Sequence, residues 1–488
     1  MNFINEIINK LSYDPESPLI FSSGIFWVMF LVFMPLYGMI RNRKVQMLSF
    51  VTLFSFYFYY KCSGFFVLLL IFTSLLDWVV SLLMSKEGVR KPLKRLYLII
   101  SICSSIGILI YFKYANFFLW NFNTLLHTNF DPLELILPVG ISFYTFQSVS
   151  YVIDVYKGRI KATDTWLEYA FFLSFFPALV AGPIVRADYF IPQIKENHHA
   201  TKNELYTGLL FILFGVIKKA IVADYLAQYN DLIFNAPGDY AGFEVLMAII
   251  GYMVQIYCDF SGYSDMAIGI ALIMGFRLNQ NFNFPFKATN LSDFWRRWHI
   301  SLSSWLKDYI YIPLGGNRKG TARTYLNNML TMLIGGLWHG AAWKYIIWGG
   351  LHGGGLAVHK ASKPWLQKIP DNNFTNAIFW LITMLFLALT FVVFRAANWH
   401  DSMVITSSVF RDFYIASIPA FISARTTWLI LLSLIIVTHA LPQRFWRLLT
   451  VAFVYSPWVD KLIIFIIVIQ LVLELQSSEI TPFIYFQF

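Results

Sequence analysis

The sequence is short of charged residues, and this shortage narrows the classes of protein that it can encode. Asp, Glu, Lys and Arg make up only 13% of the 488 residues, while hydrophobic residues make up 58%. Soluble domains carry about 25% charged residues, so a soluble chain of this composition would lack the polar surface that it needs. A lipid bilayer removes that requirement, because lipid can face the excess apolar side chains.

Cysteine is also scarce, with only Cys62, Cys103 and Cys258 present. They are unevenly spaced, form no CxxC pair and lie in or beside apolar runs, which is typical of small core residues. We therefore expect neither a disulfide framework nor a metal site. The sequence also lacks an internal repeat, a low-complexity segment and any polar stretch long enough for a soluble domain.

The net charge of +10 comes without a long basic tail, so it does not indicate nucleic-acid binding. The basic residues cluster in short loops between apolar runs, as in the cytoplasmic loops of membrane proteins. Two such loops, at residues 41–44 and 86–95, predict an N-terminus on the outer side of the membrane. The same topology places the C-terminus on the outer side as well.

Long apolar runs are spread along the whole chain, and they predict an all-α polytopic membrane protein with about twelve transmembrane helices. The first run, residues 19–40, is longer than a signal-peptide core and precedes no small-residue cleavage pattern, so we expect a retained span. Runs near residues 166–184, 205–228 and 243–276 are interrupted by polar or small residues. Membrane depth tolerates such interruptions only inside protein or beside a wet cavity.

His339 gives the strongest functional signal, because it lies inside the apolar stretch TMLIGGLWHGAAWKYIIWGG, residues 331–350. Small residues on both sides of it allow helices to approach closely and leave room beside the imidazole. An ionisable side chain in a transmembrane segment indicates a functional site by default, and imidazole suits general-base chemistry near neutral pH. The alternative is a core histidine that is hydrogen-bonded between helices.

Residues 290–313 have the pattern of an amphipathic helix at the membrane interface. Asn290 is placed to cap this helix, with Asp293 in its first turn. Trp298 belongs to a tryptophan-rich apolar face, and His299 lies on or next to that face. The helix would therefore point His299 inward, although a membrane-surface helix whose basic residues only bind lipid headgroups remains an alternative.

Asp259, Tyr263 and Asp265 occur within QIYCDFSGYSD, which interrupts a long apolar run. An isolated ionised carboxylate at membrane depth would be very unfavourable, so both aspartates must be paired, protonated or wetted by a cavity. They either line a substrate channel or fix helices to one another. Further on, the turn GGNRKG places Arg318 and Lys319 where they could meet phosphates, although an ordinary cytoplasmic turn explains it equally well.

Six stretches together resemble the membrane-bound O-acyltransferase superfamily, and within it the bacterial branch that contains alginate O-acetyltransferases. They are PVGISFYTFQ (138–147), FFPALVAGPIVR (175–186), YCDFSGYSDMAIG (257–269), NFNFPF (281–286), FWRRWHISLSSWLKDYIYIPLGGNR (294–318) and GGLWHGAAW (335–343). They follow one another in the family's order and cover most of residues 135–360.

The resemblance implies a fold in which transmembrane, interfacial and re-entrant helices surround a central funnel. Residues 1–134 would form N-terminal transmembrane helices, and residues 135–360 the catalytic core with the interfacial helix at 290–313. Residues 361–488 would form C-terminal transmembrane helices that end in the aromatic sequence FIYFQF.

The resemblance also implies the reaction and its residues. The family's near-invariant catalytic histidine corresponds to His339, and its second histidine to His299. A thioester donor, either acetyl-CoA or the phosphopantetheine thioester of an acyl carrier protein, would arrive from the cytoplasm without any bound cofactor. Arg318 and Lys319 would contact the donor's phosphates. Side chains expected to line the substrate path are Asp259, Tyr263, Asp265, Asn290, Trp298, Trp338 and His352.

The C-terminal FIYFQF is similar to the aromatic C-terminus of small single-span partners in teichoic-acid D-alanylation systems. That similarity implies that Tyr485 accepts the acyl group and passes it to an extracytoplasmic transferase. Simple aromatic anchoring of the terminus is the alternative.

Three functions remain open, besides that of a structural scaffold for a secretion complex. The first is acetyl transfer toward hydroxyls of an extracytoplasmic polysaccharide, through a partner transferase, in the bacterial cytoplasmic membrane. The second is transfer of D-alanyl or another acyl group from an acyl carrier protein to a cell-envelope polymer. The third belongs to another class, a transporter or lipid scramblase with a wet central cavity.

Overall fold

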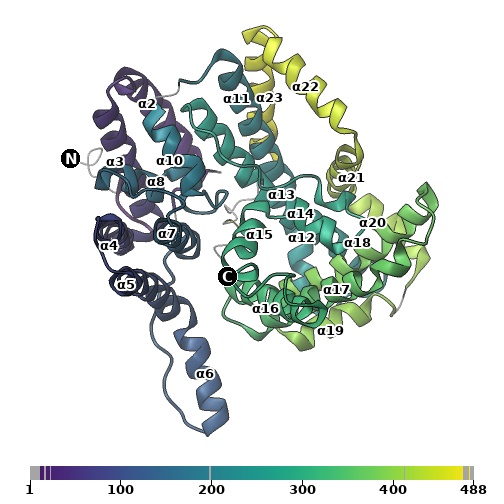
Figure 1. Cartoon of the computed structure of the whole chain (residues 1–488). Coiled ribbons are helices and arrows are strands. Elements are labelled where there is room, and N and C mark those ends of the chain that lie inside the picture. Colours follow the sequence, from purple (N-terminus) through teal and green to yellow (C-terminus); the bar gives the residue numbers. More distant parts are fainter. Residues whose placement is uncertain are drawn as a thin grey trace. The chain divides into compact units, whose positions relative to one another are not determined.

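A computed structural model describes residues 11–15, 18–21, 23–196, 199–411, 413–475 and Phe483. Throughout these residues the regular secondary structure is helical, which confirms the all-α prediction (Figure 1). The chain forms two compact units. One contains the chain up to Leu209 together with Met266–Asn279, and the other contains Leu210–Asp265 together with the chain from Gln280 onward. The three-part division expected from the sequence stays a prediction.

Along the chain up to α11, where it first passes from one unit to the other, the helices are short to medium in length. Their bounds are α2 (Gly24–Ile40), α3 (Lys44–Ser63), α4 (Val67–Ser85), α5 (Lys91–Leu109), α6 (Ala115–Leu126), α7 (Ile141–Tyr156), α8 (Trp166–Ser174), α9 (Phe176–Leu179), α10 (Ala187–Glu196) and α11 (Lys202–Val216), with a 3₁₀ turn η1 (Gly64–Phe66) and a π turn η2 (Ile110–Tyr114).

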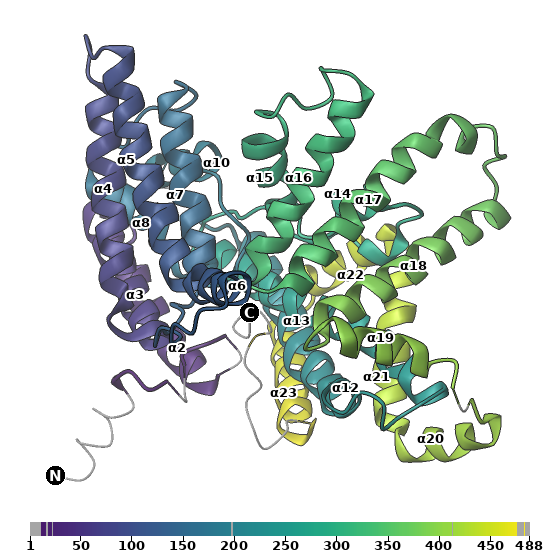
Figure 2. The same cartoon turned by 90° about the horizontal axis from the view of Figure 1, so that it is seen from below.

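One buried carboxylate holds four helices of the first unit in register. Asp77 on α4 accepts hydrogen bonds from Ser101 on α5 and Ser148 on α7, each at 2.6 Å, and from Tyr169 on α8 at 2.8 Å. Figure 2 shows α4, α5 and α7 lying side by side. Because a buried carboxylate is costly without partners, these bonds specify how the four helices pack.

The second unit continues the chain with more helices. Their bounds are α12 (Asp224–Asn235), α13 (Phe243–Ile273), α14 (Leu291–Arg297), α15 (Ile300–Leu306), α16 (Thr321–His339), α17 (Trp343–Leu366), α18 (Asn373–Arg395), α19 (Trp399–Ser408), α20 (Ile418–Ala424), α21 (Thr426–Ala440), α22 (Gln443–Tyr455) and α23 (Trp458–Leu475), with the turns η3 (Ile217–Ala223), η4 (Pro285–Lys287), η5 (Lys307–Tyr311) and η6 (Ile415–Ser417). Both α11 and α13 contribute residues to each unit.

Helix starts in the second unit follow from their capping residues. The side chain of Asn290 accepts a hydrogen bond from the backbone N–H of Asp293, which confirms the predicted cap of α14. Asn372 and Thr375 form a reciprocal capping box at the start of α18. Such side-chain acceptors satisfy backbone N–H groups that a helix start leaves without partners.

The hairpin of α16 and α17 forms because glycines let the two helices touch (Figures 1 and 2). A Cβ atom added to Gly336 would lie 2.2 Å from the carbonyl oxygen of Tyr345, and one added to Gly349 would lie 2.4 Å from that of Met332. No larger residue fits without moving backbone. Small residues at these crossings therefore bring the end of α16 against the start of α17.

Within the described residues, five helical segments are long and apolar enough to cross a membrane. They are Lys44–Ser85, Lys91–Leu126, Lys202–Asn235, Phe243–Ile273 and Asn373–Arg395. A sixth is added if α20 and α21, which meet at a 93° bend, count as one span. These helices support a multi-pass membrane protein, whereas the expected number of twelve spans is not confirmed.

Candidate active site

His339 is the last residue of α16, and the second unit buries it in a cage of aromatic rings. It is 4% exposed. Its ring centroid lies 5.1 Å from that of Trp338, 5.2 Å from that of Trp348 and 5.3 Å from that of Phe394. The cage comes from the end of α16, the start of α17 and the end of α18. The glycine-rich hairpin brings the first two together. The chain then leaves the helix at Gly340, where a Cβ atom would lie 2.1 Å from the ring of Tyr345.

His339 stands at the C-terminal end of α16, and this position bears on its role as a base. The C-terminus of a helix carries a partial negative charge, which stabilises a nearby cation. An imidazole that takes a proton there is therefore better supported than one at mid-helix. This suits a side chain that accepts a proton and later returns it.

His299 lies in a break between α14 and α15, and this differs from the continuous helix predicted for residues 290–313. Its backbone adopts φ +44°, in the left-handed region that residues other than glycine rarely occupy. Two backbone hydrogen bonds hold the break: Asn283 N–H donates to the carbonyl of Arg297, and Ile300 N–H donates to that of Asn281, both at 2.9 Å. The interruption turns His299 into the protein, where it is fully buried.

The side chain of Asn281 fixes which nitrogen of His299 carries the proton. Its Oδ1 atom accepts from the backbone N–H of Ser301 at 3.2 Å and from the Ser301 hydroxyl at 2.9 Å, while its Nδ2 donates to Ser264. A backbone N–H can only donate, so the atom facing it must be the amide oxygen. Nδ1 of His299 lies 3.3 Å from that oxygen and must therefore be the donor.

His299 consequently presents the lone pair of Nε2 when its ring is neutral. The residue lies outside the candidate membrane-spanning helices, and burial lowers its pKa to about 3. The ring is thus neutral at physiological pH, with its proton on Nδ1. Trp338 contacts both histidines, because its ring centroid is 5.9 Å from that of His299 and 5.1 Å from that of His339.

His352 has the opposite arrangement. It is buried on α17, and its Nδ1 atom accepts a hydrogen bond from the indole N–H of Trp295 at 3.3 Å. The lone pair that a base would use is therefore already engaged. The rings of Phe294, Trp348 and Phe386 pack around it, which indicates a histidine that joins α14, α17 and α18.

Residues 165–394, which contain all three histidines, match the model of the membrane-bound O-acyltransferase family. The protein of Pseudomonas putida called "Probable alginate O-acetylase AlgI" is 37% identical over 96% of this chain and 100% of its own length. The chain belongs to the membrane-bound O-acyltransferase family. It is an O-acyltransferase, and the family together with the apolar helices makes it a multi-pass membrane protein.

Other relatives of this acyltransferase act in different envelope systems. The peptidoglycan O-acetyltransferase of Helicobacter pylori is 42% identical over 64% of this chain and 64% of its own length. The teichoic acid D-alanyltransferase of Bacillus subtilis is 31% identical over 58% of this chain and 74% of its own length.

The carboxylates expected along the substrate path of the acyltransferase lie in ion pairs. Lys219 Nζ lies 2.5 Å from Asp259 and 2.8 Å from Asp224, and Lys218 Nζ lies 2.6 Å from Asp265. Both lysines come from the π turn η3, whereas Asp259 and Asp265 come from α13. These ion pairs supply the counter-charges that carboxylates need within an apolar run. They favour the interpretation that Asp259 and Asp265 fix helices to one another over the interpretation that they line a channel.

Tyr263 and Trp298, also expected along the path, are both buried. Trp298 is buried among Phe282, Phe294 and Phe391. Tyr263 packs against Phe483, with 5.0 Å between ring centroids. Both side chains therefore pack against aromatic rings, and their place along a substrate path stays a prediction.

Arg318 and Lys319 are exposed in the turn after η5 and are not brought to the histidines by any described contact. Gly315 and Gly316 in this turn have φ +116° and +57°, which explains the glycines. Donor binding by the two cations stays a prediction. Tyr485 lies outside the described residues.

Sequence reasoning missed Asn281, Lys218 and Lys219. Asn281 stands in the NFNFPF stretch, but nothing in that stretch shows that it folds back onto His299. The adjacent lysines were a readable signal, because they are two cations inside the apolar run 205–228 and an interior carboxylate needs a counter-charge.

Proposed function

We propose that this acyltransferase moves an acetyl group from cytoplasmic acetyl-CoA toward hydroxyls of an extracytoplasmic polysaccharide, in the bacterial cytoplasmic membrane. The observation that carries the proposal is the pair of buried histidines, both in contact with Trp338, in a chain of this family. The relatives named for alginate and peptidoglycan acetylation support an acetyl group and a polysaccharide acceptor.

His339 acts as the general base of the transfer. Its imidazole takes the proton of the attacking hydroxyl while that oxygen bonds to the thioester carbonyl carbon. The carbon–sulfur bond then breaks, and His339 returns the proton to the departing thiolate. One ester is made, one thioester is consumed, and no acyl-enzyme intermediate on serine is needed.

His299 supports the same step through the lone pair of Nε2. Asn281 holds the ring so that this lone pair faces away from the Asn281 amide, where it can accept a hydrogen bond from another O–H or N–H group of the bound substrates, which leaves the proton of the attacking hydroxyl to His339. The bound substrates are thereby oriented before His339 removes that proton. Holding the reacting groups in a fixed orientation in this way raises the rate of the attack.

Tyr485 carries the acetyl group from this site to a partner transferase on the outer side. The support comes from Phe483, which is 1% exposed and packs 5.0 Å from Tyr263 and 5.6 Å from Phe260. Phe260 in turn contacts His299, with 4.6 Å between centroids. Tyr485 follows Phe483 by two residues in the sequence.

The relay is tested by trapping acetyl-tyrosine. Membranes that contain the wild-type protein and labelled acetyl-CoA should yield a C-terminal peptide with acetyl on Tyr485, detected by mass spectrometry. Tyr485→Phe should abolish that label and polymer acetylation while leaving protein level unchanged. Normal polymer acetylation by Tyr485→Phe would exclude the relay but leave the role of His339 intact.

D-alanyl transfer from a carrier protein is the second candidate, favoured by the Bacillus subtilis relative. The two donors separate in one assay. Purified protein should acetylate its acceptor with labelled acetyl-CoA alone, whereas the alternative requires a charged carrier protein and leaves labelled acetyl-CoA unused. Arg318 and Lys319 are the cations that we expect to meet the donor's phosphates, so Arg318→Gln with Lys319→Gln should raise KM for acetyl-CoA.

A further inference from the structure

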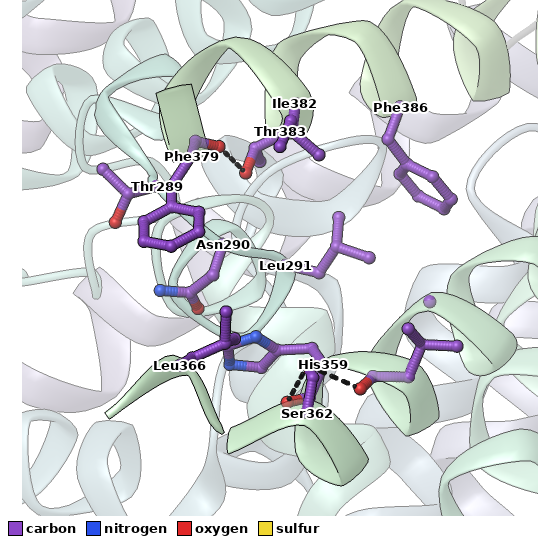
Figure 3. Close-up of a pocket in the computed structure, with 12 residues that line it drawn as sticks. Thr289, Asn290, Leu291, His359, Ser362, Leu366, Phe379, Ile382, Thr383 and Phe386 are labelled. Carbon is purple, nitrogen blue, oxygen red and sulfur yellow. Dashed lines mark hydrogen bonds between the residues drawn. The ribbon is translucent and has the colours of Figure 1, made fainter. Parts of the chain in front are cut away.

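A cavity of about 400 Å³ lies between α17, α18 and the start of α14, apart from the histidines of the proposed site (Figure 3). Most of its wall is apolar, and no carboxylate lines it. The apolar wall is formed by Leu291, Gly355, Val358, Leu366, Phe379, Ile382 and Phe386. A volume of this size lies within the range of small-molecule pockets.

The polar side chains of the cavity are few. Asn290 and His359 both point into it, with Thr289 and Ser362 nearby (Figure 3). The hydroxyls of Ser362 and of Thr383 donate to carbonyls of their own helices, so they are satisfied within the wall. Asn290 Oδ1 already caps α14, so the polar groups that remain for a ligand are the Thr289 hydroxyl, the Asn290 amide nitrogen and the His359 imidazole.

Lys363 follows His359 by one helical turn on α17, whereas Lys360 Nζ donates to Asn328 at 3.3 Å and lies 5.5 Å from the centre of the Tyr311 ring. Burial lowers the pKa of His359, and the charges of Lys363, Lys360 and Arg296 lower it further. Arg296 lies 3.4 Å from Asp293, but the arginine side chain is 73% exposed, so water screens that pair. The region beside the imidazole thus has an excess of positive charge.

The cavity faces the place where lipid is expected. Its residues on α18 fall within the first four turns of a helix that is long and apolar enough to span a membrane. Among them Ile382 is 58% exposed. An apolar hollow next to such a face, with cations near the helix start, matches an amphiphile that has an anionic head and a hydrocarbon tail.

We propose that this cavity binds one acyl chain of an anionic phospholipid, with the phosphate between Arg296 and Lys363. The charge selects the occupant, because a zwitterionic lipid carries a choline cation that these residues repel. The inference does not depend on the proposed acetyl transfer, since it concerns a different part of the second unit.

Native mass spectrometry of the full chain tests the proposal. The protein is released from vesicles that contain equal parts of phosphatidylglycerol and phosphatidylcholine. We expect the wild type to retain phosphatidylglycerol preferentially. Arg296→Gln with Lys363→Gln should weaken that retention about 25-fold, or roughly fivefold for each cation removed. The charge-matched control Lys86→Gln with Lys91→Gln, just after α4 and at the first residue of α5, should retain the lipid as the wild type does.

A second variant separates the hydrocarbon part of the site from its charge. Val358→Trp puts a large ring against the cavity and should reduce retention of both lipids, whereas Val79→Trp on α4 should not. Equal retention of the two lipids by the wild type, or equal loss in the control pair, would overturn the proposal. So would displacement of the retained lipid by coenzyme A, which would assign the cavity to the thioester donor.

Discussion

The two histidines of the site are held by different parts of the chain, and this separates their roles. His339 ends α16, where the helix terminus favours a positive ring. His299 is locked by Asn281 with its proton on Nδ1 and is kept neutral by burial. One ring is thus suited to gain a proton and the other to accept a hydrogen bond.

Substitutions of Asn281 test whether the tautomer of His299 matters. Asn281→Leu keeps a side chain of similar volume but removes the oxygen that accepts a hydrogen bond from Nδ1–H of His299. We expect kcat to fall between about 10-fold and 100-fold, the usual cost of losing a group that orients a functional histidine. Asn281→Asp keeps an oxygen at that position and should retain more activity. Its carboxylate favours the protonated ring, so the acidic limb of the pH–rate profile should move to higher pH.

A merely structural role of Asn281 predicts a different result. Both variants would then lose activity in proportion to the amount of folded protein. The pH–rate profile of the remaining activity would coincide with that of the wild type. Acetyl transfer by purified protein between pH 5 and 8 distinguishes the two outcomes.

At this scale the sequence predicts which residues are chemically costly, but not their partners. His339, Asp259 and Asp265 stand out because the bilayer disfavours ionisable groups. The ion pairs of the aspartates and the role of Asn281 depend on segments that are distant in sequence, such as residues 281 and 299. Spacing alone does not encode those contacts.

Among the elements, the hairpin of α16 and α17 sets the aromatic cage around His339. Gly336→Ala should destabilise the protein, because its Cβ would lie 2.2 Å from a backbone oxygen of α17. We expect a loss of about 1–3 kcal/mol in the free energy of unfolding, measured as a lower melting temperature in detergent. Gly350→Ala is the matched control on α17, since the nearest atom to its Cβ is 3.8 Å away. An equal effect of both changes would contradict close packing as the reason for Gly336.

The pairing of η3 with α13 rests on buried charges. Lys219→Met leaves Asp259 and Asp224 without their shared cation and should cost about 3–5 kcal/mol. Lys219→Met with Asp259→Leu should recover part of that stability, because the uncompensated carboxylate is gone. Lys195→Met, which removes a surface pair with Asp164, should have little effect. Thermal unfolding checks the series, and no recovery in the double variant would show that the lysine acts by packing instead.

The amphipathic stretch 290–313 shows how far sequence patterns predict elements. Its cap at Asn290 and its tryptophan face were predictable from local chemistry. The break at His299 was not predictable, because the left-handed backbone there is held by backbone hydrogen bonds with residues 281 and 283. A periodic pattern predicts a helix wherever local sequence permits one, while tertiary contacts decide whether it continues.

For the molecule as a whole, composition was sufficient to predict an all-helical membrane protein, and the motifs were sufficient to predict its family. Composition and motifs were not sufficient to predict the number of spans, because an interrupted apolar run is compatible with a span, a re-entrant segment or a buried core helix. In the described residues α20 and α21 meet at a 93° bend, which hydropathy alone does not reveal.

The most direct test of the account compares surface polysaccharide from cells that carry the wild type, His339→Ala or His400→Ala. His400 is an exposed histidine on α19 of the same unit, so it controls for loss of an imidazole as such. Mass spectrometry should show that O-acetyl groups disappear with His339→Ala and persist with His400→Ala, at equal protein levels in the membrane. Undiminished O-acetylation in the His339→Ala cells would contradict the catalytic role of this histidine.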